Sequence, residues 1–311
     1  ITDISLDPNY AEICGYSQQE FETGFAAHIE SVAKRMNITK EKLLEQVKHW
    51  YDGYSWDGKT FMYNPFSALN FLSQADFVNF WFNTGTPTML LNIIKKKRAP
   101  EDIVSKDFVT NRSYLESGYL PATPDEMLLF FQTGYLTVKS IDEIGFYKLD
   151  FPNTEVRAAF FQSLLAYYDI RSNQETIEIK YRIERNIRDN NPELLSNAIK
   201  KLFDVPYPIK GGKEDNYHAF LHVALNALGF DIQSEIPTED GRIDAVWHLK
   251  NLTVIIEIKQ HKTKRAETLI KDAMQQIHTK KYYEKYLGEI ILLAVAFSGS
   301  NVECKMEKIT R

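Results

Sequence analysis

The chain has 311 residues, enough for roughly two or three domains that each bury a core of their own. Its composition, 44% hydrophobic and 25% charged, is typical of a soluble globular protein, and no stretch has the roughly eighteen uninterrupted apolar residues that a membrane span needs. This excludes a membrane protein, and the formal net charge of −5 excludes a chain that is basic throughout.

The cysteines and the N-terminal residues indicate the cellular compartment of the protein. Cys14 and Cys304 are the only cysteines, so a disulfide framework and a thiol cluster for zinc are not expected, and a reducing cytoplasm fits. The N-terminus at Ile1 has no initiator methionine, basic region or apolar targeting core. We therefore expect a fragment of a longer cytoplasmic protein.

Helical signals dominate the first third of the chain. Ser17 precedes Gln18-Gln19-Glu20, and Thr39 precedes a second helical pattern, so each predicts a capped helix start. Between Trp50 and Pro87 aromatic residues alternate with turn formers, which predicts loops pinned by buried rings. The alternative, a surface that stacks on nucleic-acid bases, is disfavoured because such platforms interleave aromatics with basic residues, and this stretch has few.

The next region predicts a helix, two strands and a further helix between Asp125 and Tyr168. The strands are expected at 134–138 and 146–149, with a turn near Asp142. This order resembles a winged-helix module whose wing is the hairpin. Because the wing is acidic, and so a poor contact for DNA, we favour a structural or interdomain role.

A boundary is expected where proline, glycine and charge accumulate without apolar periodicity, at residues 182–191 and 206–212. The chain has no internal repeat. We therefore predict a multidomain α/β protein with a mainly helical domain at 1–124, a winged-helix-like connecting region at 125–211 and a final domain at 212–311.

The final domain has the most regular pattern, which predicts a compact α/β unit in the order helix, three strands, helix, strand. The helices are expected at 217–228 and 267–283, and the strands at 232–236, 242–249, 253–259 and 289–297. The third strand is so apolar at Val254-Ile255-Ile256 that we expect it to be central and buried on both faces.

Acidic residues and a lysine converge on this predicted sheet in the pattern D-x12-E-x-K, formed by Asp244, Glu257 and Lys259. Period two places Glu257 and Lys259 on one side of the sheet, and a hairpin brings Asp244 beside them. The two carboxylates and the backbone carbonyl of Ile258 suit a hard divalent cation such as Mg²⁺. The ion would polarise a phosphodiester and activate water, while Lys259 orients that water or stabilises the transition-state charge.

A structural interpretation of the same residues stays open. Glu257 and Lys259 can form an ion pair at a strand end, and Asp244 can cap a turn. A zinc site is not expected, because His222, His248, His261 and His278 form no helix-spaced pair of the H-E-x-x-H kind.

Charge is unevenly distributed along the chain. Between residues 241 and 286, ten Lys and Arg outnumber five acidic residues, a net charge of +5 that favours contact with a polyanion or else marks a solvated lysine-rich face. The residues that we expect to contact nucleic acid are Arg242, Lys262, Lys264, Arg265 and Lys280.

Three phrases, Gly241-Arg242-Ile243-Asp244, Ile256-Glu257-Ile258-Lys259 and Ala273-Met274-Gln275-Gln276-Ile277, resemble the PD-(D/E)XK nuclease domain that follows an AAA-ATPase-like domain in many bacterial proteins. The resemblance covers essentially all of residues 212 to 300. It implies a restriction-endonuclease-like αβββαβ core and a nuclease that uses Mg²⁺ or Mn²⁺, with DNA as its partner.

The resemblance also implies roles for further residues. Gln276 would reach the metal-bound water or a phosphate, although a helix-surface glutamine is the bland alternative. His218 would support the site, although a histidine near the start of a helix is more often a packed or capping residue. Glu235 would be an outer-sphere carboxylate or a third metal ligand.

Phrases in the first part of the chain, such as Trp50-Tyr51-Asp52-Gly53-Tyr54 and Tyr63-Asn64-Pro65-Phe66-Ser67, look like the closing part of the ATPase-like domain. The phosphate loop G-x-x-x-x-G-K-[ST] is absent from this sequence, so we expect no ATP site and no ATP hydrolysis. Two alternatives to a nuclease stay open, namely an inactive module that binds nucleic acid or a partner, and a structural regulator associated with an ATPase. The sequence does not predict an oligomeric state.

Overall fold

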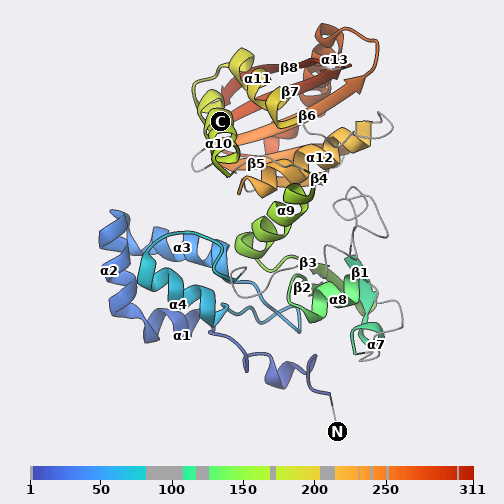
Figure 1. Cartoon of the computed structure of the whole chain (residues 1–311). Coiled ribbons are helices and arrows are strands. Elements are labelled where there is room, and N and C mark those ends of the chain that lie inside the picture. The colour runs from blue at the N-terminus through green and yellow to red at the C-terminus, as the bar shows by residue number, and fades with distance from the viewer. Residues whose placement is uncertain are drawn as a thin grey trace. The chain divides into compact units, whose positions relative to one another are not determined.

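The computed structural model describes residues 3–81, 108–116, 126–168, 173–203, 214–230, 232–238, 241–249, 252–299 and 301–311. The chain divides into two compact units, the first formed by Ile1–Arg98 and Lys106–Phe160 and the second by Ala99–Ser105 and Phe161–Arg311. It is a mixed α/β protein, with a three-stranded sheet in the first unit and a five-stranded sheet in the second (Figure 1). Among the described helices, none has the length and apolarity that a bilayer crossing requires.

The first unit begins with a group of helices, η1 (Pro8–Tyr10), α1 (Gln18–Gly24), α2 (Ala26–Met36), α3 (Lys40–Tyr51) and α4 (Pro65–Gln74). The two predicted helix starts are confirmed. The Ser17 hydroxyl accepts the amide of Glu20 while the Glu20 carboxylate accepts the amide of Ser17, and Thr39 caps α3 through the amide of Lys42. These bonds satisfy amides that an isolated helix end leaves without partners.

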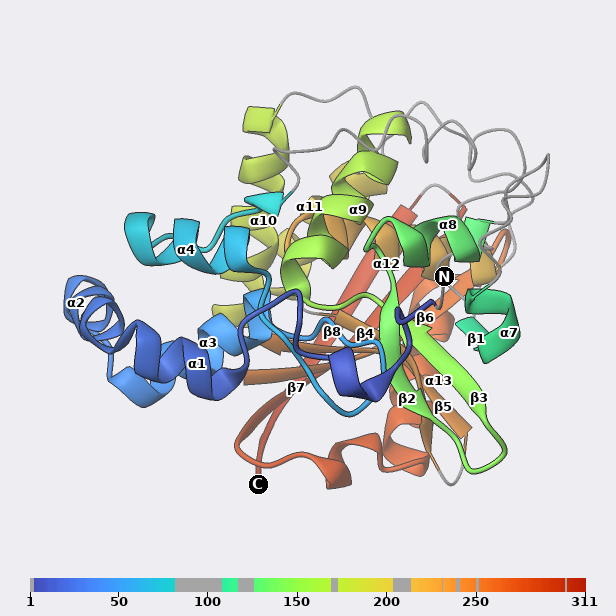
Figure 2. The same ribbon diagram turned by 90° about the horizontal axis from the view of Figure 1, so that it is seen from below.

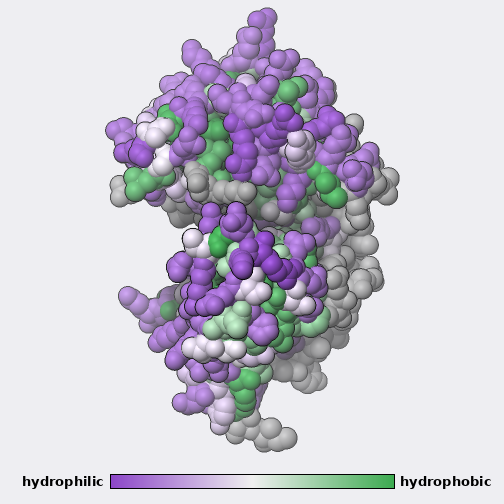
Figure 3. All heavy atoms as spheres, turned by 90° about the vertical axis from the view of Figure 1, so that its left-hand side faces the viewer, coloured by the Kyte–Doolittle hydropathy of each residue, from purple (hydrophilic) through white to green (hydrophobic). Residues whose placement is uncertain are grey.

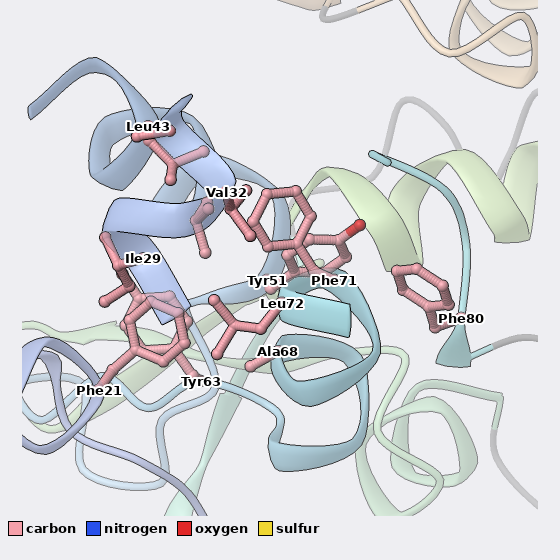
Figure 4. Close-up of a cluster of buried hydrophobic side chains, with 12 residues drawn as sticks. Phe21, Ile29, Val32, Leu43, Tyr51, Tyr63, Ala68, Phe71, Leu72 and Phe80 are labelled. Carbon is pink, nitrogen blue, oxygen red and sulfur yellow. The ribbon is translucent and has the colours of Figure 1, made fainter. Parts of the chain in front are cut away.

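Buried apolar side chains fill the space between these helices. Ile29 and Val32 of α2 belong to one buried cluster with Tyr51 of α3 and Phe71 of α4 (Figure 4). Tyr63, which follows a loop, stacks on Phe21 with 4.7 Å between the ring centroids. The prediction of loops with buried rings is confirmed at Tyr63 and Phe80. It is wrong at 65–74, where α4 forms and Phe66 is exposed, and residues 82–87 lie outside the described residues.

The three-stranded sheet of the first unit has the antiparallel order β1 (Phe108–Asn111), β3 (Phe146–Asp150), β2 (Thr137–Ile141). With α8 (Glu126–Gln132) before the hairpin and α9 (Thr154–Tyr168) after it, the predicted order of helix, strand, turn, strand and helix is confirmed. Figure 2 shows the hairpin of β2 and β3 projecting to its turn. β1, which is followed by the short α7 (Arg112–Leu115), was not predicted.

The polar segment at 182–191 is not the aperiodic boundary that the sequence analysis expected. Its first seven residues belong to α10 (Asn173–Arg188), and α11 (Pro192–Phe203) follows almost at once. Ile179, Ile183 and Ile187 are buried at a spacing of four, which is the apolar stripe of a helix. The expectation was wrong because charged residues on the other faces of α10 masked this stripe. Residues 206–212 lie outside the described residues, and the proposed domain limits stay predictions.

The second unit contains the five-stranded sheet. Its elements are α12 (Glu214–Ala227), β4 (Ile232–Thr238), β5 (Gly241–Leu249), β6 (Leu252–His261), α13 (Ala266–Thr279), η3 (Tyr282–Lys285), β7 (Glu289–Ser298) and β8 (Asn301–Thr310). The strands lie in the order in which they occur in the chain, and every pair is antiparallel except β6 and β7. The predicted order is present, β6 is central, and β8 is an additional strand.

Helices cover both faces of this sheet. Phe297 of β7 packs against Phe203 of α11 and Tyr217 of α12, with ring centroids 4.5 and 4.7 Å apart. Its neighbour Ala296 packs against Leu269 of α13. Because successive side chains of a strand point to opposite faces, α11 and α12 cover one face and α13 covers the other.

The surface is mainly polar on the face that Figure 3 shows, where the hydrophobic residues among those coloured form small, scattered groups. Strongly exposed apolar side chains such as Ile144 and Leu287 are separated in sequence. Isolated apolar residues of this kind are normal on a protein surface. The buried polar groups are therefore more informative about function than the exposed apolar side chains.

Candidate active site

Asp244 and Glu257 lie on the same face where β5 and β6 separate. The antiparallel register runs from Leu249↔Leu252 to Ala245↔Ile256, and one further step places Asp244 opposite Glu257. At this step the amide of Ile258 donates to Asp244 Oδ2 at 2.7 Å. The Asp244 carboxylate thus takes a position in which main-chain hydrogen bonds between β5 and β6 would otherwise continue.

Lys259 completes the group from the next position on the same face of β6. Its Nζ lies 2.8 Å from Glu257 Oε1, and its side chain is 21% exposed whereas that of Glu257 is fully buried. The parallel register sets Ala294 beside Glu257 and Ala296 beside Lys259, so small side chains flank both residues on the face that α13 covers. The structure therefore brings together the three residues of the D-x12-E-x-K pattern.

Burial makes Glu257 an unusual carboxyl. Burial, and then the negative charge of Asp244, raises the pKa of Glu257, while Lys259 and Lys280 lower it. Glu257 Oε2 is also buried, and within the described part of the chain it has no hydrogen-bond partner. A buried oxygen without a partner is costly unless a ligand or solvent satisfies it.

This donor set fits a hard divalent cation. Glu257 supplies the buried oxygen without a partner, and Asp244 supplies a second carboxylate on the same face. Because the N–H and C=O of one strand residue point to the same side, the carbonyl of Ile258 points toward Asp244 as its amide does. Among the described side chains, no group of three His, Cys, Asp or Glu gathers, so water and phosphate would complete the coordination.

Comparison with known proteins bears on the same region. Residues 212–307 match the PD-(D/E)XK nuclease superfamily. Members of this superfamily are generally metal-dependent nucleases, and the five-stranded sheet is consistent with their fold. The matched part of the chain contains Asp244, Glu257 and Lys259.

A similar protein comes from Azotobacter chroococcum mcd 1, where it is described as an uncharacterized protein in the vnfD 5′ region. It is 29% identical over 310 residues, which cover 96% of this chain and 57% of that protein. The chain thus spans little more than half the length of this relative, and the likeness extends beyond the PD-(D/E)XK region.

Gln276 and Tyr282 are linked by hydrogen bonds to β5. Gln276 Nε2 donates to the Tyr282 hydroxyl at 3.3 Å, and this hydroxyl donates to the carbonyl oxygen of Arg242 at 2.7 Å. The structure therefore directs Gln276 toward a tyrosine, and its contact with a metal-bound water stays a prediction. Sequence reasoning gave Tyr282 no role, because the predicted helix extended to residue 283 and included this tyrosine.

Basic residues of the matched region gather around the end of β6. Lys262, Lys264 and Arg265 are exposed in the loop after this strand. Continuing the β5–β6 register places exposed Arg242 opposite Lys259, and the charge of half-buried Lys280 lowers the pKa of Glu257. The predicted contacts with nucleic acid thus lie near the end of β6 and the start of β5, apart from Lys280, which follows α13.

The remaining predicted site residues lie where their roles stay open. His218 is on α12 and Glu235 on β4, but their side chains are outside the described residues. Two other histidines have structural contacts, since buried His222 packs edge-on against Phe161 and His278 pairs with Glu307 at 2.8 Å.

Proposed function

We propose that the PD-(D/E)XK domain hydrolyses phosphodiester bonds of DNA with Mg²⁺ or Mn²⁺, and that Asp244, Glu257 and Lys259 form its catalytic centre. The observation that carries this proposal is the buried, unpartnered oxygen of Glu257 beside Asp244 and Lys259. Burying such a carboxylate costs free energy that a well-packed apolar residue would not, and the negative charge of Asp244 adds to the cost at Glu257. A cation that both carboxylates bind accounts for it.

Each residue has a separate task in this proposal. Asp244, Glu257 and the carbonyl of Ile258 hold the cation, which polarises the phosphodiester and lowers the pKa of an attacking water when bound. Lys259 orients that water or neutralises the charge that develops on the phosphate oxygens. Hydrolysis adds the water across one phosphorus–oxygen bond. The hydroxide joins phosphorus, and the leaving oxygen takes a proton, so the products are a phosphate end and a hydroxyl end.

A polyanionic substrate follows from the charges around this centre. The exposed residues near the end of β6 include Arg242, Lys262, Lys264 and Arg265. Lysine and arginine side chains bind phosphates of the backbone and supply most of the sequence-independent affinity for DNA. We further propose, from the resemblance of the first unit to the closing part of an AAA-ATPase-like domain, that this region regulates or localises the nuclease.

The direct test is incubation of linear, nicked and single-stranded DNA with the protein and Mg²⁺ or Mn²⁺. We expect cleavage that EDTA abolishes. Asp244→Asn and Glu257→Gln should abolish cleavage, since each keeps the shape of the side chain but removes a charge that holds the cation. Lys259→Ala should still cleave in a cation-dependent manner, about a hundredfold to a thousandfold more slowly.

A matched control is Asp272→Asn, which removes an exposed acid from α13 and should leave the rate unchanged. All these variants should retain affinity for DNA, because binding rests on the basic residues. If the unmodified protein binds DNA but cleaves no form above the Asp244→Asn background with either metal, the enzyme proposal is wrong. The alternative of an inactive module that binds nucleic acid then replaces it.

A further inference from the structure

Tyr282 joins three elements that surround the proposed metal site. Its hydroxyl donates to Arg242 on β5 at 2.7 Å and accepts from Gln276 on α13 at 3.3 Å, while Tyr282 itself belongs to η3. We infer that Tyr282 is a positioning residue, which holds the separated end of β5 so that Asp244 can bind the cation, and that Gln276 acts through it. This inference rests on the proposed function.

The local backbone turns Tyr282 into the interior. α13 ends at Thr279, earlier than the predicted end at 283, and Lys281 adopts a left-handed conformation with a φ of 47°. This turn redirects the chain into η3 and leaves Tyr282 only 1% exposed. A buried tyrosine hydroxyl needs partners, and here both partners come from other elements.

The carbonyl of Arg242 lies beyond the point at which the register of β5 with β6 ends. On one side, the partner of Arg242 in β4 is Pro237, which has no amide hydrogen to donate. On the other side, the register of β5 with β6 ends at Ala245↔Ile256. The Tyr282 hydroxyl donates to this carbonyl and thereby fixes the backbone two residues before Asp244.

The tyrosine ring has a second neighbour at the site. Lys280 Nζ lies 5.8 Å from the centroid of the Tyr282 ring, a cation–π distance. The charge of Lys280 also acts on Glu257. Tyr282→Phe keeps this ring and removes only the hydroxyl, so the variant deletes the bonds to Arg242 and Gln276 and leaves the contact with Lys280.

Calorimetric titration of the whole chain with Mn²⁺ tests the inference without depending on catalysis. Tyr282→Phe should weaken Mn²⁺ binding about tenfold to a hundredfold, the usual effect of removing a group that orients a metal ligand. Tyr283→Phe is the matched control, because it removes a neighbouring, half-buried tyrosine hydroxyl from the same η3 and should leave the affinity unchanged.

Gln276→Ala provides a second variant that leaves the buried tyrosine in place. It should weaken Mn²⁺ binding less than Tyr282→Phe, and the double variant should bind no more weakly than Tyr282→Phe alone. Such non-additivity is expected when one residue acts through the other. Additive losses would contradict the part of the inference that assigns Gln276 to Tyr282.

The possible outcomes separate this inference from the proposed function. If Asp244→Asn abolishes Mn²⁺ binding and both Tyr282→Phe and Gln276→Ala bind normally, the inference is wrong and the metal site stands. A lower Tm with unchanged affinity likewise makes Tyr282 merely structural. If Asp244→Asn binds Mn²⁺ as the unmodified protein does, the proposed site itself is wrong.

Discussion

Two fully buried glutamates, Glu155 in the first unit and Glu257 in the second, have different surroundings. Glu257 faces the ammonium group of Lys259, whereas Glu155 Oε1 accepts the amide of Trp81 at 2.8 Å. Glu155 Oε2 has no hydrogen-bond partner among the described residues. Burial raises the pKa of Glu155 to about 7, and the amide of Trp81 opposes this shift. Glu155 is therefore a group whose ionisation affects stability near neutral pH.

We predict that Glu155→Gln reduces the dependence of stability on pH. The folded state holds a proton on Glu155 up to a pH of about 7, while the unfolded chain releases it near the ordinary value of 4.5. The unmodified protein should therefore lose stability as pH rises through this window, and the loss should be complete above it. Glutamine has no charge to bury, so the variant should be more stable above pH 7 by on the order of 1–3 kcal/mol.

Urea denaturation at several pH values from about 5 to 8 measures this difference. Glu45→Gln, an exposed position on α3, is the matched control and should preserve the pH dependence of the unmodified protein. If the unfolding free energy changes with pH equally in the Glu155 variant and in the unmodified protein, the prediction is wrong.

Sequence alone predicts the charged residues of the candidate site better than it predicts the residues that hold them in position. Asp244, Glu257 and Lys259 could be placed together because strand period and a hairpin depend on local spacing. Tyr282 could not, because its position depends on the left-handed turn at Lys281 and on the contact with Arg242, 40 residues earlier in the chain. Long-range bonds of this kind leave no periodic signal.

The loop between β6 and α13 is the element that connects the catalytic face to the basic residues. His261 Nδ1 accepts the amides of Thr263 and Lys264, each at 3.2 Å, and Ser298 Oγ donates to the carbonyl of Lys264 at 2.7 Å. These bonds fix the backbone of the loop while its cationic side chains remain exposed. An ordered, cationic loop is well suited to contact phosphates.

We predict that replacing Lys262, Lys264 and Arg265 with alanine weakens DNA binding and makes the affinity less dependent on salt concentration. Each lost phosphate contact on duplex DNA should reduce the slope of log affinity against log salt concentration by about 0.9. Fluorescence anisotropy with EDTA present measures this slope without cleavage. Lys34→Ala on α2 is the control, and an unchanged slope in the triple variant would contradict a DNA contact through this loop.

The elements differ in how much of them the sequence predicts. The apolar run of β6 is unmistakable because the strand is buried between two others, whereas β8 carries Glu303, Lys305 and Glu307 on one face of an edge strand. Edge strands commonly carry such charges, which hide the strand pattern. β8 was therefore not predicted, and packing of α11 against it, including the bond from the Cys304 amide to Ser196 Oγ at 2.9 Å, appears only in three dimensions.

At the scale of the whole molecule, each unit has its own buried cluster, as Phe21, Tyr51 and Phe71 show for the first and Ile255, Ile277 and Leu292 for the second. Units with separate cores commonly unfold in separate transitions. Metal binding should affect one of them and the ionisation of Glu155 the other.

Calorimetric melting tests this prediction. Mn²⁺ at about a hundred times its Kd should stabilise the second unit by about 2.7 kcal/mol and raise the Tm of one transition. Asp244→Asn should abolish that shift, whereas Glu155→Gln should alter the other transition. A single transition that responds to both changes would contradict independent unfolding of the two units.

The two sides of the metal site also differ in when they can form during folding. β5 and β6 are consecutive strands separated by residues 250 and 251, so the partners Asp244 and Glu257 approach through contacts that are local in the chain. The parallel neighbour β7 reaches Glu257 only after α13 has crossed the sheet. Because distant contacts are slower to close, we expect the acidic pair to assemble while still hydrated, and Glu257 to lose its water last. The free-energy cost of dehydrating Glu257 then arises after the main folding barrier. It should therefore raise the unfolding rate more than it lowers the folding rate.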